Sequence, residues 1–173
     1  GRAGNVIGGG DWAENRVVPD CIKAWSLKKT VSIRNPLATR PWQHVLEPLS
    51  GYLKLAANLY KSNKFHGEAY NFGPNQDNNF TVNELIKKMS LQWPGSKWNY
   101  KSLKNVSFKE SGLLKLNCEK SLNDLNWMPT LDFEQTIKMT IDWYRYYNET
   151  NGLNMQKFNN DQILEYMNIL NKR

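Results

Sequence analysis

The chain has 173 residues, 40% of them hydrophobic, and a formal net charge of +7. This composition argues for a folded domain and against disorder, and no apolar run approaches the ~18 residues of a membrane span. The lysines are scattered and form no run of like charges, so neither a nucleic-acid nor a membrane partner is expected. Cys21 and Cys118 show no disulfide or metal spacing, so we expect free thiols, no metal site and a cytoplasmic location.

The first half of the chain alternates short strand and helix patterns. In order they are a strand end over 2–7 that runs into a glycine loop, a helix over 18–28, a strand over 30–34, a loop over 35–41, an extended run over 43–46 and a helix over 48–60. The alternation of Val31 and Ile33 predicts the second strand. Pro48 suits the first turn of the last helix, whose apolar stripe is Leu49, Leu53, Ala56, Ala57 and Tyr60.

The second half adds one strand and several helices with recognisable caps. In order they are a strand over 69–72, a helix after Thr81, a short helix capped by Asn117, a long helix after Asp132, and a terminal helix or tail from Lys157. Thr81 with Glu84, and Asp132 with Gln135, have the spacing of capping boxes. Alternating short strands and helices predict an α/β arrangement.

Three motifs resemble the C-terminal half of the extended short-chain dehydrogenase/reductases, the family of nucleotide-sugar dehydratases and epimerases. They are Arg2-Ala3-Gly4-Asn5-Val6-Ile7-Gly8-Gly9-Gly10-Asp11-Trp12, Ile33-Arg34-Asn35-Pro36-Leu37-Ala38-Thr39-Arg40-Pro41-Trp42-Gln43-His44-Val45 and Gly67-Glu68-Ala69-Tyr70-Asn71-Phe72-Gly73-Pro74. The resemblance implies the C-terminal part of a Rossmann-type α/β fold, including its small substrate-binding domain. Residues 1–150 are interpreted as this substrate-binding portion and residues 151–173 as a terminal helix or tail. An N-terminal NAD-binding half is expected to lie outside the chain.

Within that family the chain is most similar to the branch that dehydrates CDP-glucose. The dehydratases of dTDP-glucose typically carry a tyrosine and an Arg-Asp-Trp-type motif where this chain reads Arg40-Pro41-Trp42. The resemblance therefore implies a CDP-sugar substrate, converted to CDP-4-keto-6-deoxyglucose with release of water, and NAD as cofactor. It also implies a homo-oligomer that forms through the half outside this chain.

The groups that would perform this chemistry are not recognisable in the sequence. Gly8-Gly9-Gly10 is no dinucleotide fingerprint, because no helix opens directly behind it within a βαβ unit. Tyr60 with Lys64, and Tyr100 with Lys104, have the spacing of the family's catalytic pair, but they follow the sugar-binding motifs instead of preceding them. We interpret both as chance matches. No catalytic residue is predicted, and the chain alone is expected to be inactive.

Arg40 is the leading candidate for a binding residue. A guanidinium can hold a diphosphate through two parallel hydrogen bonds, and Pro36 and Pro41 would stiffen its loop. Asn5 could donate to a diphosphate or sugar oxygen, although an Asn there could also bond the following turn. The predicted substrate-binding residues are Asn5, Val17, Val18, Ile33, Arg34, Arg40, Asn75 and Lys109, and the predicted cofactor-binding residues are Asn5 and Gly8.

Several of these assignments have a plain structural alternative. Arg34 could equally be an ordinary exposed charge, and Lys109 stands beside Glu110, which would weaken its field at a phosphate. Trp42 and His44 are interpreted as structural. At the level of function, the alternatives are a dTDP- or UDP-sugar dehydratase or epimerase, and a non-catalytic binding module on the same fold.

Overall fold

The computed structural model describes residues 1–75, 78–100 and 114–172. Its elements in chain order are β1 (Arg2–Ala3), β2 (Asn5–Ile7), α1 (Val17–Ser26), β3 (Thr30–Ile33), β4 (Thr39–Arg40), β5 (Trp42–His44), α2 (Leu46–Lys61), the short 3-10 helix η1 (Asn63–Phe65), β6 (Asn71–Phe72), β7 (Phe80–Thr81), α3 (Val82–Leu91), β8 (Lys97–Tyr100), α4 (Glu119–Leu125), α5 (Phe133–Thr150) and α6 (Met155–Leu170). The mixture of helices and short strands confirms the predicted α/β class.

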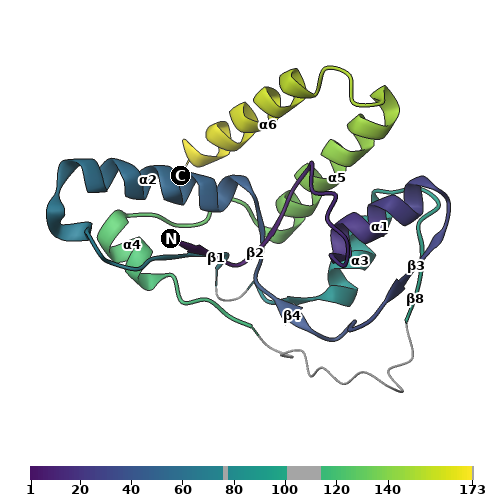
Figure 1. The fold of residues 1–173 in the computed structure, drawn as a ribbon, viewed down its shortest axis with the longest axis horizontal. Coiled ribbons are helices and arrows are strands. Elements are labelled where there is room, and N and C mark those ends of the chain that lie inside the picture. The colour runs from purple at the N-terminus through teal and green to yellow at the C-terminus, as the bar shows by residue number, and fades with distance from the viewer. Residues whose placement is uncertain (76–77, 101–113, 173) are drawn as a thin grey trace.

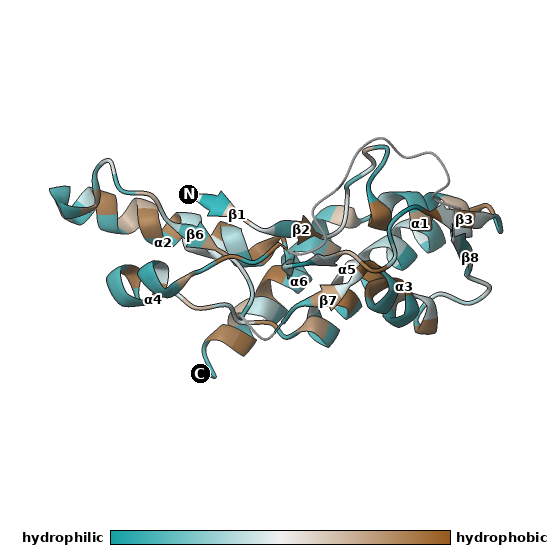
Figure 2. Ribbon diagram, turned by 90° about the horizontal axis from the view of Figure 1, so that it is seen from below, coloured by the Kyte–Doolittle hydropathy of each residue, from teal (hydrophilic) through white to brown (hydrophobic). Residues whose placement is uncertain are grey.

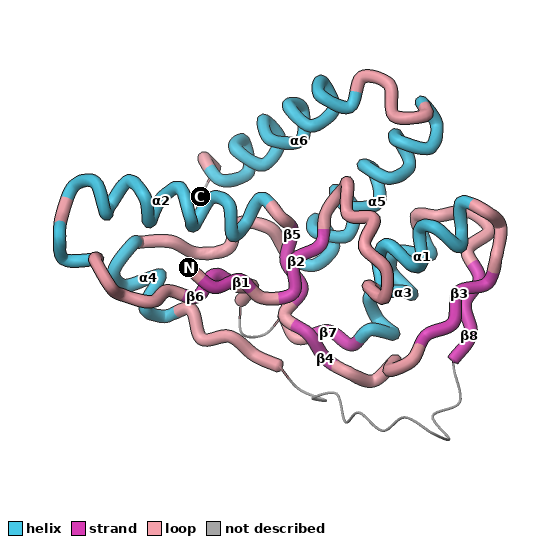
Figure 3. Tube along the Cα trace, in the orientation of Figure 1, coloured by secondary structure: helices cyan, strands magenta, loops and turns pink. Residues whose placement is uncertain are grey.

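The strands of the described residues pair two by two rather than in one broad sheet (Figure 3). Three pairs are parallel: β1 with β6, β2 with β5, and β3 with β8. The fourth pair, β4 with β7, is antiparallel, and it places Arg40 opposite Phe80. Parallel neighbours require crossover segments, and the helices between the strands provide them.

The molecule extends as two lobes on either side of β2 (Figure 1). We call the part built from α1, β3, β8, α3 and α5 the pocket lobe, and the part built from β1, β6, α2 and α4 the α2 lobe. The largest core cluster lies in the pocket lobe, where Ile22, Leu85, Ile86, Ile137 and Ile141 are fully buried. The α2 lobe has a smaller cluster that consists of Phe65, Tyr70, Phe72, Leu125 and Trp127.

Both capping boxes predicted from the sequence are present. The Thr81 hydroxyl accepts from the Glu84 amide at 3.1 Å, and the Glu84 carboxylate accepts from the Thr81 amide at 2.7 Å. Asp132 and Gln135 make the reciprocal pair at the start of α5. At α4 the prediction is off by one residue, because Cys118 is the N-cap while the Asn117 side chain accepts from the Glu119 amide.

The loop predicted over 35–41 contains a strand. Residues 39 and 40 form β4, because residues 80 and 81, distant in the sequence, supply the pairing partner. The extended run predicted over 43–46 lies one to two residues too late, since β5 ends at His44 and α2 begins at Leu46. Both differences have the same cause: the local sequence pattern does not show which distant segment a strand will pair with.

The orientation of α2 is the clearest correction. The apolar stripe that predicted this helix faces outward: Leu53 is 74% exposed and Tyr60 is 94% exposed. The buried side instead carries Glu47, Pro48 and Gly51. A Cβ on Gly51 would fall 2.2 Å from the Phe72 ring, so this glycine lets the helix pack closely on β6. In Figure 2, brown hydrophobic stretches recur along the ribbon of α2 between hydrophilic ones.

The sequence predicted either a terminal helix or a tail after residue 150, and the structure has a helix there, α6. Its Tyr166 hydroxyl bonds the Glu47 carboxylate and the Ser50 hydroxyl, both at 3.0 Å, and its Gln162 amide donates to the Met139 carbonyl at 2.7 Å. Burial beside Glu47 raises the pKa of Tyr166 to about 12, so the phenol stays protonated and can donate. The helix is therefore fastened to α2 and α5 by buried polar contacts as well as by packing.

Candidate nucleotide-binding pocket

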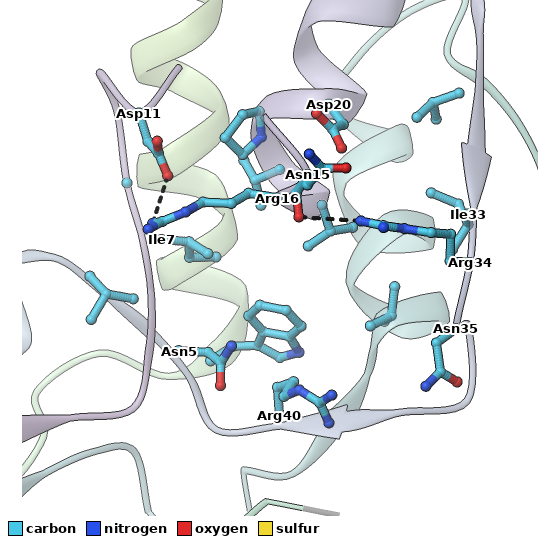
Figure 4. A pocket seen from close by; sticks show the side chains of 18 of the residues that line it. Asn5, Ile7, Asp11, Asn15, Arg16, Asp20, Ile33, Arg34, Asn35 and Arg40 are labelled. Atoms are coloured by element: carbon cyan, nitrogen blue, oxygen red, sulfur yellow. Dashed lines mark hydrogen bonds and ion pairs between the residues drawn. The ribbon is translucent and has the colours of Figure 1, made fainter. Parts of the chain in front are cut away.

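The pocket lobe contains a cavity of about 520 Å³, within the usual range for small-molecule sites. Four segments enclose it: the end of β2, the start of α1, the end of β3, and β4 with β5 (Figure 4). Its lining residues are Gly4, Asn5, Val6, Ile7, Gly8, Asp11, Asn15, Arg16, Val17, Val18, Pro19, Asp20, Val31, Ser32, Ile33, Arg34, Asn35, Arg40, Trp42 and Val82. The cavity thus lies alongside β2 and reaches the loop that follows its carboxyl end, where ligands of parallel α/β folds collect.

Most of the predicted site residues line this one cavity: Asn5, Gly8, Val17, Val18, Ile33, Arg34 and Arg40. Asn75 does not line it; that residue is exposed, and its carbonyl accepts from the Asn78 amide at 2.8 Å. The predicted contact at Lys109 lies outside the described residues. The resemblance therefore selected residues that are distant in the sequence and adjacent in space.

Arg40 is buried in the wall of the cavity. Its backbone is held by the β4–β7 pairing, and one guanidinium nitrogen donates to the Thr39 carbonyl at 2.8 Å. Trp42, on the next strand, donates from its indole nitrogen to the Phe80 carbonyl at 3.0 Å, which ties β5 to the same β7 segment. A guanidinium fixed this way and removed from water interacts more strongly with an anion than an exposed one does.

The amino-terminal end of α1 also faces the cavity. Its N-cap residue Arg16 supplies no side-chain cap, and Val17 and Val18 in the first turn line the pocket. The first amides of a helix have no partner inside the helix, and they carry the positive end of its dipole. This end of α1 and Arg40 together make the cavity suitable for a phosphate group.

Charged side chains at the cavity include three that were not among the predicted site residues: Asp11, Arg16 and Asp20. Arg16 pairs with Asp11 at 3.2 Å, and the Arg34 guanidinium reaches the Asn15 carbonyl at 3.5 Å. Asp20, on α1, is the second carboxylate of the lining. A carboxylate in the first turn of a helix is ordinarily explained by the helix dipole, so nothing in the sequence pattern marked Asp20 as a pocket residue.

The glycine loop owes its composition to packing inside the chain. A Cβ on Gly8 would fall 2.8 Å from Val45, and a Cβ on Gly9 would fall 1.9 Å from the Trp143 ring. Trp143 in turn donates to Asn159 of α6 at 2.7 Å, and the Tyr144 hydroxyl donates to the Asp11 carbonyl at 2.7 Å. Helix α5 therefore holds the loop that carries Gly8 and Asp11 against the cavity.

His44 lies behind this loop and is not part of the lining. Its ring is buried, its Nε2 atom has no hydrogen-bond partner in the part of the chain that the structure describes, and burial lowers its pKa to about 4. A neutral, enclosed imidazole packed beside the glycine loop agrees with the structural interpretation of this residue. Tyr60, from the first Tyr/Lys pair, lies on the exposed side of α2 and does not line the cavity.

Among residues 1–75, 78–100 and 114–172, no cluster of three or more His, Cys, Asp or Glu side chains could hold a metal ion. Nor is any described helix long and apolar enough to cross a membrane.

Comparison with solved structures defines the class of fold. The chain superposes on a dTDP-glucose 4,6-dehydratase from Bacillus anthracis in complex with NAD, with a TM-score of 0.69, 23% identity, and coverage of 86% of this chain and 44% of that one. An epimerase from Methanothermobacter thermautotrophicus gives a TM-score of 0.70 at 20% identity, with coverage of 90% and 44%. The fold is therefore that of part of an extended short-chain dehydrogenase/reductase, as the sequence predicted.

Sequence comparison adds a curated relative. The chain is 38% identical over 167 residues to the CDP-glucose 4,6-dehydratase of Salmonella typhimurium, which confirms the resemblance noted in the sequence. The match covers 96% of this chain but 45% of that enzyme, so the chain spans about half the length of the curated relative. The chain matches no protein-family model.

Proposed function

We propose that this chain is the nucleotide-sugar-binding portion of a CDP-glucose 4,6-dehydratase. In the complete reaction CDP-glucose becomes CDP-4-keto-6-deoxyglucose and water is released. The observation that carries the proposal is the convergence of the buried Arg40 guanidinium and the open end of α1 on one cavity. The identity to the Salmonella enzyme supports the choice of the cytidine nucleotide.

The binding arrangement follows from the chemistry of the lining. The diphosphate would lie between Arg40 and the first amides of α1, where charge-assisted hydrogen bonds are strongest. Asn5 has both a donor and an acceptor for a sugar or phosphate oxygen. The nucleoside would extend toward β3, along Ile33 and Arg34.

NAD would meet this chain only at the edge of the cavity, through Asn5 and Gly8. Gly8 is buried against Val45 and has no side chain of its own, so it presents backbone to a neighbouring group. When bound, NAD supplies the hydride acceptor of the reaction.

The catalytic Tyr/Lys pair and the glycine fingerprint would lie outside this chain, so we propose that the chain alone is inactive. Free Cys21 and Cys118 suit the reducing cytoplasm, which we propose as its location.

Calorimetry with CDP tests the site directly. The Arg40→Ala variant should bind CDP with an affinity lower by roughly 2 kcal/mol, the scale of a lost charge-assisted contact. Arg40→Lys should recover part of the loss, because a lysine keeps the charge without the bidentate geometry. Arg145→Ala, which changes an exposed arginine on α5, is the control and should bind as the unmodified chain does. Equal CDP affinity in Arg40→Ala and Arg145→Ala would contradict the proposal.

A further inference from the structure

Asp20 is a carboxylate in the lining of the cavity. It lies in the first turn of α1, is half-buried, and lines the pocket beside Val17, Val18 and Pro19. Its amide donates to the Arg16 carbonyl at 2.9 Å, while its carboxylate has no hydrogen bond or ion pair to the residues that the structure describes. Arg16, the nearest arginine in the sequence, pairs with Asp11 instead.

The position of Asp20 separates it from the proposed phosphate site. In the view of Figure 4, Asp20 lies at the upper end of the cavity near Asn15, whereas Asn5 and Arg40 lie at the lower end. A carboxylate repels phosphate, so the diphosphate belongs with Arg40 and the carboxylate is left to face another part of the ligand. Ile33 and Arg34 of the β3 side also line this region. The ligand part that fits there is the base.

The two pyrimidine types differ at the atom that such a carboxylate would meet. Cytosine carries an amino group at position 4, a donor, while uracil and thymine carry a carbonyl oxygen there, an acceptor. A carboxylate accepts from the cytosine amino group, and it repels the oxygen of the other two bases. The neighbouring Arg34 guanidinium only donates, which suits the remaining acceptors, N3 and O2, on the same edge of cytosine.

We propose that Asp20 determines the base specificity of this pocket by accepting a hydrogen bond from the exocyclic amino group of cytosine. The inference rests on the proposed function, because it assumes that the cavity holds a nucleoside diphosphate. It adds what the family resemblance leaves open: which side chain makes the pocket select a cytidine nucleotide over a uridine or thymidine one.

The test compares CDP and UDP binding by calorimetry in three proteins: the unmodified chain, Asp20→Asn, and Asp161→Asn. Asp161 is an exposed acid on α6, so its variant makes the same chemical change away from the cavity. The unmodified chain and Asp161→Asn should prefer CDP roughly tenfold or more. Asp20→Asn should bind the two nucleotides within about twofold, because an amide can turn to donate to an oxygen or to accept from an amino group. Circular dichroism verifies that each variant is folded.

The possible failures separate the two claims. A folded, unmodified chain that binds neither nucleotide would contradict the proposed function itself. If both nucleotides bind with equal affinity to the unmodified chain, or if Asp20→Asn keeps its full preference for CDP, the pocket stands and the role of Asp20 is wrong. If CDP binds tightly and the preference for CDP over UDP is lost only in Asp20→Asn, the result supports both the proposed function and the role of Asp20.

Discussion

The pocket lobe and the α2 lobe differ in the size of their hydrophobic cores. In the pocket lobe, α1, α3 and α5 enclose a continuous cluster that includes Ile22, Leu85 and Ile137. In the α2 lobe, a small aromatic cluster lies on one side of α2, while Leu53 and Tyr60 are exposed on the other. The first lobe has a core sufficient to hold a binding cavity in shape. The second lobe leaves apolar side chains of α2 exposed on its surface.

This difference suggests where the stability of the chain resides. Removing a fully buried side chain loses its burial and leaves a cavity, whereas trimming an exposed one changes little. The candidate binding cavity belongs to the well-packed lobe, so its geometry should tolerate changes on the exposed side of α2. Four predictions test the contrast, from the largest expected effect to the smallest.

A matched pair of leucines compares the two lobes directly. Leu85→Ala, which truncates a fully buried side chain of α3, should lower the free energy of unfolding by about 4 kcal/mol. Leu53→Ala, on the exposed side of α2, should change it by less than about 0.5 kcal/mol. Urea unfolding followed by circular dichroism measures both. Similar losses in the two variants would contradict the division into a packed and an incomplete lobe.

Acid should destabilise the junction between the lobes through His44. Because burial lowers its pKa from 6.5 to about 4, the unfolded chain binds a proton before the folded chain does. Stability should therefore be full above pH 6.5 and fall by about 3 kcal/mol as the pH drops to 4. Glu84, whose pKa is lowered by bonds from Thr81, contributes a loss only at lower pH, because its unfolded pKa is 4.5.

The two histidines of the chain supply the control for this pH dependence. His66 is exposed, so His66→Gln should keep the decline between pH 6.5 and 4. His44→Gln should flatten it, whatever its effect on stability at neutral pH. Urea unfolding across this pH range measures the slope. An unchanged slope in His44→Gln would mean that another group titrates there.

The capping box at the start of α3 should contribute less to the free energy of unfolding than the buried side chains of the pocket lobe do. Thr81→Ala removes the hydroxyl that accepts from the Glu84 amide, and the free energy of unfolding should fall by about 1 kcal/mol. Thr81→Ser keeps an accepting hydroxyl and should lose much less. Thermal unfolding compares the two. If the serine variant loses as much as the alanine variant, packing of the threonine methyl group, rather than the cap, is what stabilises this end of α3.

The exposed side of α2 should affect association more than stability. Leu53→Gln with Tyr60→Gln should leave the unfolding free energy nearly unchanged, because both side chains are exposed. The unmodified chain should self-associate at high concentration through this apolar surface, and the double variant should do so less. Light scattering over a concentration series measures the difference. If both proteins remain monomeric at all concentrations, the exposed side of α2 does not promote self-association and the prediction is wrong.

The features that sequence reasoning predicted well are local ones. The capping boxes at Thr81 and Asp132 depend on residues three apart, and the structure contains both. The outward orientation of α2 was missed because apolar residues lie all round that helix, and the buried side is chosen by Phe72 and Trp127, far along the chain. The requirement for glycine at position 9 could not be predicted from the local sequence either, because it comes from the Trp143 ring on α5, which lies far along the chain.

The candidate site shows the same division. The family resemblance brought Asn5, Arg34 and Arg40 together, which spacing along the chain could not have done. Asp11 and Asp20 were missed because each has an ordinary local explanation, one in a loop and one in the first turn of a helix. Only their placement on a shared cavity distinguishes them from surface acids.

The central claim is that the cavity of the pocket lobe holds a cytidine diphosphate with its phosphates at Arg40. A crystal structure of the chain grown with CDP tests it most directly. We expect the diphosphate within hydrogen-bonding distance of the Arg40 guanidinium and of the first amides of α1, with the base toward β3. CDP bound elsewhere on a correctly folded chain, with Arg40 out of its reach, would contradict the account.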